Sequence, residues 1–153
     1  MQWTLAPAYA YLAVLSIVLT VIDIRHKVLP NVLTLTGYPI MLALLAIPAI
    51  SGQDWQAWSR AATGSALTLG VFTGMALLAP RSFGMGDAKL AGVLAMPLTW
   101  FSWTHTIAAM AGAFLLSALV SVGLLCSGRV NRSSLIPFGP FLIGSTWMVS
   151  VTW

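Results

Sequence analysis

The sequence predicts an all-α membrane protein with six transmembrane helices. Of its 153 residues, 59% are hydrophobic and 7% are charged, and the mean hydropathy is +0.92, values that ordinary soluble domains of this length do not show. A helix needs roughly 20 mostly apolar residues to cross a bilayer core about 30 Å thick. The chain offers several such stretches, separated by short polar segments, which indicates a polytopic protein embedded in a lipid bilayer.

The polar segments set the boundaries of the predicted helices. We expect helices at about Pro7 to Ile24, Asn31 to Ile50, Ala61 to Pro80, Asp87 to Trp103, His105 to Cys126, and Pro137 to the end of the chain. The first apolar run has no basic residue before it, so we interpret it as a permanent helix and not as a secretory signal. Residues 1–153 are therefore predicted to form a single membrane-embedded domain.

Charged and aromatic residues predict the orientation of these helices. Basic residues favour cytoplasmic loops, and they gather at alternate helix borders: Arg25, Lys27, Arg81, Lys89, Arg129 and Arg132. Tryptophans fall at the other borders: Trp3, Trp55, Trp58, Trp100, Trp103, Trp147 and Trp153. Both termini are therefore predicted on the non-cytoplasmic side. The net charge of +4 is spread over three short loops, which does not indicate nucleic-acid binding.

Cysteine and histidine exclude several kinds of site. Cys126 is the only cysteine, so the chain has neither an internal disulfide nor a multi-cysteine metal site. His26 and His105 are predicted on opposite sides of the membrane, and there is no His-Glu-x-x-His motif. We predict no metal and no cofactor.

Two of the three acidic residues are expected at the same membrane border. The first predicted helix finishes beside Asp23 and the fourth begins near Asp87, so both acids lie on the predicted cytoplasmic side. An acid at the edge of a membrane bundle marks a functional position by default. Two nearby carboxylates share a proton, so that one acts as a base toward water and the other as an acid toward a carbonyl oxygen.

Simpler interpretations of these acids stay open. Asp87 follows Gly84 and Gly86, glycines that permit close approach of another chain, but it could equally cap the fourth helix. Asp23 could pair with Arg25, Lys27 or Lys89 at the interface. The third acid, Asp54, is expected to be solvated in an outer loop.

Three stretches resemble the type IV prepilin peptidases, membrane aspartic proteases with a GxGD motif. The first is Asp23 with the downstream segment Leu29-Pro30-Asn31, and the second runs from Gly84 to Leu90 with the sequence GMGDAKL. The third is IPFGPF, residues 136–141, which contains Pro137, Gly139 and Pro140. The resemblance implies that Asp23 and Asp87 are the catalytic pair. The supporting motif residues would be Pro30, Asn31, Gly84, Gly86, Lys89, Pro137, Gly139 and Pro140.

The resemblance also implies a substrate and a place. Such an enzyme removes the short leader of a pilin or pseudopilin precursor at the cytoplasmic face of the bacterial inner membrane. Long members of the family add a four-cysteine domain and methylate the new N-terminus, and this chain is similar to the short, peptidase-only form of tight-adherence pilus systems. We therefore expect an aspartic endopeptidase without N-methyltransferase activity.

Two other functions remain as alternatives. Asp23 and Asp87 could bind the ion of a small proton- or ion-coupled transporter, or the chain could be a noncatalytic assembly subunit. Gly70 and Gly74, one turn apart, predict a close helix contact. That contact would be either internal or part of a homodimer.

Overall fold

The structure, a computed structural model of the chain, describes residues 2–26, 29–52, 54–79, 83–127 and 137–152. Within these residues the predicted all-α fold is confirmed. A 3-10 turn, η1 (Gln2–Leu5), leads into six helices: α1 (Ala6–His26), α2 (Asn31–Gly52), α3 (Trp55–Leu78), α4 (Met85–Phe101), α5 (Trp103–Cys126) and α6 (Gly139–Thr152).

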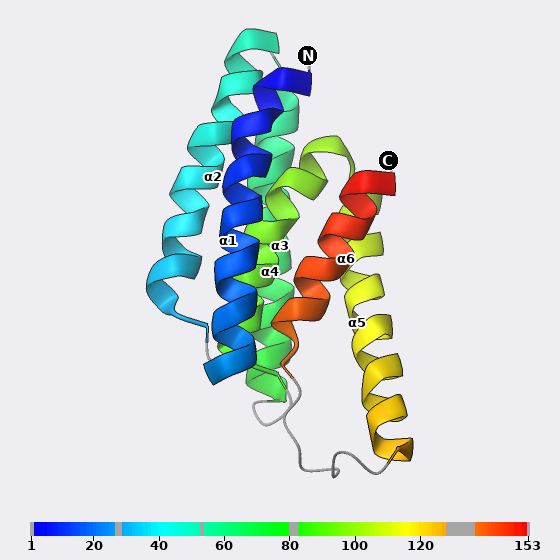
Figure 1. Ribbon diagram of the computed structural model, residues 1–153. Coiled ribbons are helices and arrows are strands. Elements are labelled where there is room, and N and C mark those ends of the chain that lie inside the picture. Colours follow the sequence, from blue (N-terminus) through cyan, green and yellow to red (C-terminus); the bar gives the residue numbers. More distant parts are fainter. Residues whose placement is uncertain (1, 27–28, 53, 80–82, 128–136, 153) are drawn as a thin grey trace.

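The helices run alternately up and down, so the ends of α1, α3 and α5 lie with the starts of α2, α4 and α6 at the lower end of the bundle (Figure 1). Both ends of the described chain lie toward the upper end of the bundle. This agrees with the prediction that the two termini lie on the same side of the membrane. Which side of a membrane this is stays a prediction. Four of the basic residues on which it depends, Lys27, Arg81, Arg129 and Arg132, lie outside the described residues.

Among the residues that the structure describes, four segments are long and apolar enough to span a membrane: Trp3–His26, Asn31–Gly52, Trp55–Leu78 and Trp103–Cys126. The chain is therefore a multi-pass helical membrane protein. The other two helices are shorter, with 17 residues in α4 and 14 in α6, or about 26 and 21 Å at 1.5 Å per residue. That these two also cross the bilayer stays a prediction.

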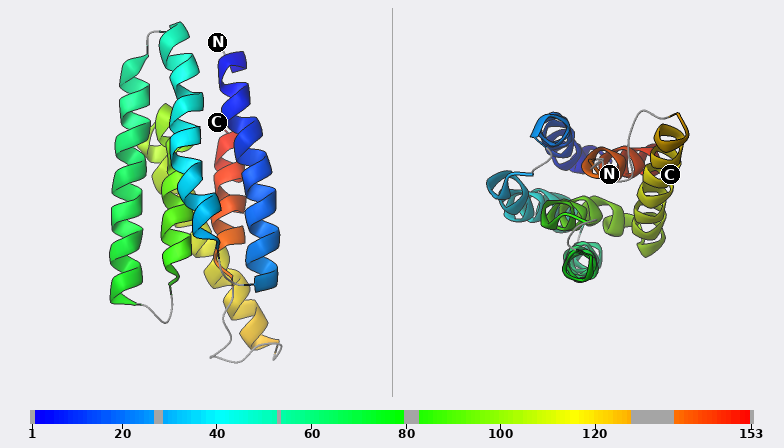
Figure 2. Two further views of the ribbon diagram at one scale, coloured as in Figure 1. Left: turned by 90° about the vertical axis from the view of Figure 1, so that its left-hand side faces the viewer. Right: turned by 90° about the horizontal axis from the view of Figure 1, so that it is seen from below.

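Helix α4 forms the centre of the bundle. Every residue from Leu90 to Trp100 is buried, as expected for a helix that is hydrophobic on all sides. It contacts each of the other five α-helices, with α3 on one side and α6 on the other (Figure 2). Because Asp87 lies in the first turn of α4, this packing fixes its backbone.

Glycines let neighbouring helices approach α4 closely, but not the two that we predicted. A Cβ at Gly92 would lie 2.2 Å from the hydroxyl of Tyr38, and one at Gly64 would lie 2.4 Å from Oγ1 of Thr99. At Gly70 and Gly74 nothing lies within 4 Å of the same position. The internal alternative for this pair is therefore wrong, because a Cβ at either glycine would meet no described neighbour; a contact in a homodimer stays a prediction.

Helix α3 begins at Trp55, earlier than the predicted Ala61. Its start is fixed by Asp54, whose exposed carboxylate caps the helix by accepting a hydrogen bond of 3.0 Å from the Ala57 amide. One turn on, Arg60 donates hydrogen bonds to the carbonyl oxygens of Thr99 and Trp100 at the end of α4. This lone cation on the upper side thus satisfies helix C-terminal carbonyls.

Candidate active site

Asp23 lies in the last turn of α1 and is only 5% exposed. It is buried because it shares a helix face with Ser16 and Leu19, seven and four residues before it, and that face packs against the bundle. Its Oδ2 has no hydrogen-bond partner within the described chain. A buried carboxylate oxygen without a partner is costly, so this position is not explained by stability.

Gly139, the first residue of α6, faces this carboxylate. Its backbone interacts with Asp23, and a Cβ at Gly139 would lie 2.5 Å from Oδ2. Only glycine therefore lets α6 begin against the end of α1. Pro140 follows within the first turn of the helix, where the missing N–H of proline costs nothing, and Pro137 precedes the helix.

Asp87 lies in the first turn of α4, three residues after Gly84. Gly84 is the N-cap of the helix in an extended conformation, and no side-chain hydrogen bond caps it. Oδ2 of Asp87 lies 3.2 Å from the position of a Cβ on Gly84, so the carboxylate is directed back toward the start of its own helix. That Asp87 serves as a cap stays a prediction.

The three motif stretches converge at this lower end. The ammonium of Lys89 donates a hydrogen bond of 2.7 Å to Oδ1 of Asn31, which joins the first and second stretches. Lys89 was one of the cations considered as a partner for Asp23, but its ammonium binds Asn31 instead. A Cβ at Gly86 would lie 2.9 Å from that of Leu29. Pro30, partly exposed just before α2, accepts a hydrogen bond from Thr34.

Two contacts near the acids were not expected from the sequence. The hydroxyl of Tyr38 donates a hydrogen bond of 2.7 Å to the carbonyl oxygen of Lys89. Helix α2 therefore binds Lys89 twice, at its backbone through Tyr38 and at its side chain through Asn31. Four phenylalanines also pack together, with ring centroids 5.0 to 6.3 Å apart. They are Phe72, Phe83, Phe114 and Phe138.

The phenylalanine cluster links two of the motifs. Phe83 directly precedes Gly84, Phe138 directly precedes Gly139, and their ring centroids lie 5.3 Å apart. The cluster therefore connects the segment that carries Asp87 to the glycine that contacts Asp23. The signal in the sequence was a phenylalanine immediately before Gly84 and another immediately before Gly139.

The carboxylates of Asp23 (buried) and Asp87 (partly buried) could share one proton if they lie close together, since two like charges at short distance do not both ionise readily. Within the described residues no group of three His, Cys, Asp or Glu side chains forms a candidate metal site.

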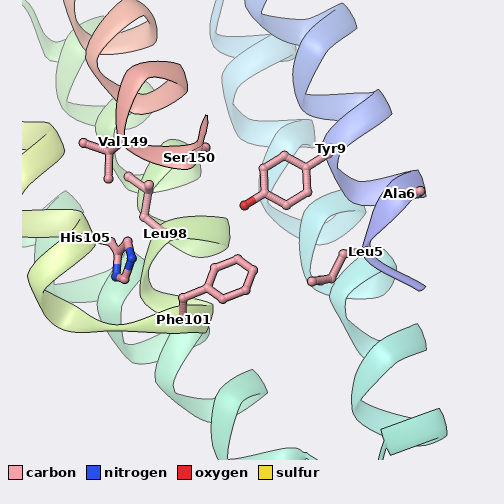
Figure 3. Close-up of a pocket in the computed structure, with 8 residues that line it drawn as sticks. All are labelled: Leu5, Ala6, Tyr9, Leu98, Phe101, His105, Val149 and Ser150. Carbon is pink, nitrogen blue, oxygen red and sulfur yellow. The ribbon is translucent and has the colours of Figure 1, made fainter. Parts of the chain in front are cut away.

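A hollow of about 490 Å³ lies at the opposite, upper end of the bundle between α1, α4, α5 and α6 (Figure 3). Tyr9 and His105 face it among mainly apolar side chains. It contains neither acid, and it is separate from the candidate site.

The fold is that of a multi-pass helical membrane protein with two acids toward one end of its bundle. The chain belongs to the type IV leader peptidase family, whose model matches residues 10–126. It is 30% identical to the leader peptidase HopD of Escherichia coli, over 90% of this chain and 87% of that protein.

Longer relatives show the same similarity. The chain is 28% identical to prepilin leader peptidase/N-methyltransferases of Aeromonas hydrophila and Aeromonas salmonicida, over 98% of its own length and 52% of theirs. It thus spans about half the length of these relatives. No solved structure matches it.

Proposed function

We propose that this protein is a membrane aspartic endopeptidase that removes the leader peptide of type IV prepilins, with Asp23 and Asp87 as its catalytic pair. The observation that carries the proposal is that the segments bearing these two acids, which lie 64 residues apart in sequence (87 − 23), meet at one end of the bundle. Gly139 contacts Asp23, and Phe138 beside it packs against Phe83, four residues before Asp87. Membership of the leader peptidase family supports the reaction class. The names of the relatives, which are prepilin leader peptidases, support the substrate class.

The chemistry follows from the pair. The ionised carboxylate takes a proton from a water molecule, whose oxygen then attacks the carbonyl carbon of the scissile amide. The protonated carboxyl group gives its proton to the carbonyl oxygen. When the tetrahedral intermediate collapses, the carbon–nitrogen bond breaks, the amine leaves with a proton, and the pair again holds one shared proton.

The geometry around Asp23 suits a substrate that arrives in extended form. Gly84 and Gly139 each lie beside one carboxylate, so neither acid is covered by a side chain at these two positions. We place this end of the bundle at the cytoplasmic face of a bacterial inner membrane, on the basis of the charge distribution. The absence of N-methyltransferase activity stays a prediction.

Co-expression with a candidate prepilin tests the proposal. The unaltered protein should shorten the precursor, as seen by gel mobility and by sequencing of the new N-terminus. Asp23→Asn and Asp87→Asn should each leave it uncut, because an amide of the same shape cannot exchange a proton. Asp54→Asn is the matched control, since asparagine caps a helix as well as aspartate does.

The result also separates the alternatives. A noncatalytic subunit would leave the precursor uncut by every form of the chain, including the unaltered one. A transporter would do the same while Asp23→Asn and Asp87→Asn changed ion flux. Cleavage that persists in either variant would reject the catalytic pair.

A further inference from the structure

An apolar groove of about 490 Å³ runs between α1 and α6 on the outer surface of the bundle. It lies within the candidate membrane span Trp3–His26, and no charged side chain lines it. The lining residues are Ala13, Ser16, Ile17, Thr20, Val21, Ile143 and Trp147.

The groove leads to the candidate active site. On α1, Ser16 and Thr20 share a helix face with Asp23, since seven and three residues separate them from it. Seven residues of helix correspond to about 10 Å. On α6, Ile143 lies one turn beyond Gly139, the glycine that contacts Asp23. Both walls of the groove therefore stop about one turn before the Asp23–Gly139 contact.

The floor and the upper end of the groove are held by specific contacts. The indole nitrogen of Trp147 donates a hydrogen bond of 3.2 Å to the hydroxyl of Ser16, which joins α6 to α1. The ring of Tyr9 packs edge-on against Trp147 with centroids 6.1 Å apart. The groove is therefore a fixed feature between two packed helices.

The lining suits a helix better than a lipid chain. Ala13 and Thr20 are small, partly buried residues on one side of α1, and small residues let two helices approach closely inside a membrane. The more exposed Ile17 (66%) and Val21 (45%) would contact the sides of such a helix.

We propose that this groove binds the apolar transmembrane helix of the membrane-anchored protein that the enzyme cuts, with the scissile bond just below it at Asp23. This inference rests on the proposed function. A membrane-anchored substrate held by its helix in the groove would present the adjoining segment to both acids. The groove would then select substrates by the apolar helix that follows the cleavage site.

Photocrosslinking tests the position of the substrate. A benzoylphenylalanine residue is introduced at Ile17, and at Leu67 and Leu119 as controls, which are 60% and 69% exposed on α3 and α5. Each form also carries Asp87→Asn to keep the prepilin uncut. We expect a crosslink to the prepilin from position 17 alone. Crosslinks from position 67 or 119 but not 17, or crosslinks from 17 to lipid only, would overturn the inference.

A kinetic comparison tests the role of the groove without relying on crosslinks. Thr20→Trp fills the groove, and Leu67→Trp adds the same side chain to a surface outside it. Each variant is given the full prepilin and a short peptide that spans the cleavage site without the apolar helix. Thr20→Trp should cut the full prepilin at least about tenfold more slowly, mainly through KM, and the short peptide at the unaltered rate.

Two results would contradict the groove. In the first, Thr20→Trp slows cleavage of the full prepilin and of the short peptide equally. In the second, Thr20→Trp cuts both substrates at the same rates as Leu67→Trp does. If the unaltered protein cuts neither substrate, the proposed function itself fails, which is a different outcome from failure of the groove.

Discussion

The backbone of Gly139 lies so close to the carboxylate of Asp23 that an added Cβ would come within 2.5 Å of Oδ2. This contact places the start of α6 against the end of α1, and it explains physically why a glycine stands in the third motif stretch. The groove between α1 and α6 stops about one turn before this contact.

Gly139→Ala should therefore impair cleavage strongly. The new methyl group must displace either Asp23 or the start of α6, and a displacement of about 1 Å in an active site can cost about a hundredfold in rate. Gly144→Ala is the matched control on the same helix, since nothing lies within 4 Å of its Cβ position. The measurement is the rate of prepilin cleavage. Equal rates for the two variants would show that the contact does not matter.

The hydrogen bond between Lys89 and Asn31 should couple the two residues energetically. Lys89→Met and Asn31→Ala should each lower the midpoint of thermal unfolding, and the double variant should lose less than the sum of the two. We expect a coupling of about 0.5–1 kcal/mol, because the contact is partly exposed. Strictly additive losses would mean that the bond contributes nothing.

Gly92→Ala should destabilise the bundle, because its methyl group would collide with the hydroxyl of Tyr38. Overpacking of this kind costs about 1–3 kcal/mol. Removing the hydroxyl with Tyr38→Phe should recover part of the loss in the double variant. In Gly74→Ala, where the site is open, unfolding should occur at the same temperature or a higher one. A Gly92→Ala protein as stable as Gly74→Ala would contradict the packing of α2 on α4.

Phe83→Ala should lower the rate of prepilin cleavage more than Phe101→Ala does, although both variants lose one aromatic ring. The Phe83 ring packs against Phe72, Phe114 and Phe138, and each such pair contributes about 0.5–1.5 kcal/mol. Its loss would free the segment that precedes Asp87. The comparison is Phe101→Ala at the opposite end of the bundle, with cleavage and thermal unfolding both measured. An equal effect of the two variants on cleavage would rule out a positioning role for the cluster.

The sequence predicted the helices and the motifs because both depend on local patterns. Apolar length defined the spans, and Gly84, Asp87 and Asp23 stood out as polar or flexible positions in an oily chain. The start of α3 was placed too late because Asp54 was interpreted as solvated, whereas it caps the helix.

Contacts between distant helices could not be predicted in the same way. Gly70 and Gly74 have the spacing of a packing motif, but spacing alone does not say which helix face meets a neighbour, and Gly64 and Gly92 make the close contacts instead. The bond from Tyr38 to the Lys89 carbonyl depends on the depth to which one side chain reaches. No periodic pattern in the sequence encodes that depth.

The most direct test of the central claim is the cleavage rate of purified protein in lipid vesicles with a prepilin as substrate. Asp23→Asn, Asp87→Asn and the double variant are compared with Asp54→Asn. If the two acids act as one unit, each single variant should fall to the background rate and the double variant should be no slower than either, while Asp54→Asn stays active. A single variant that keeps a rate within about tenfold of the unaltered enzyme, a loss of only about 1.4 kcal/mol, would contradict the account.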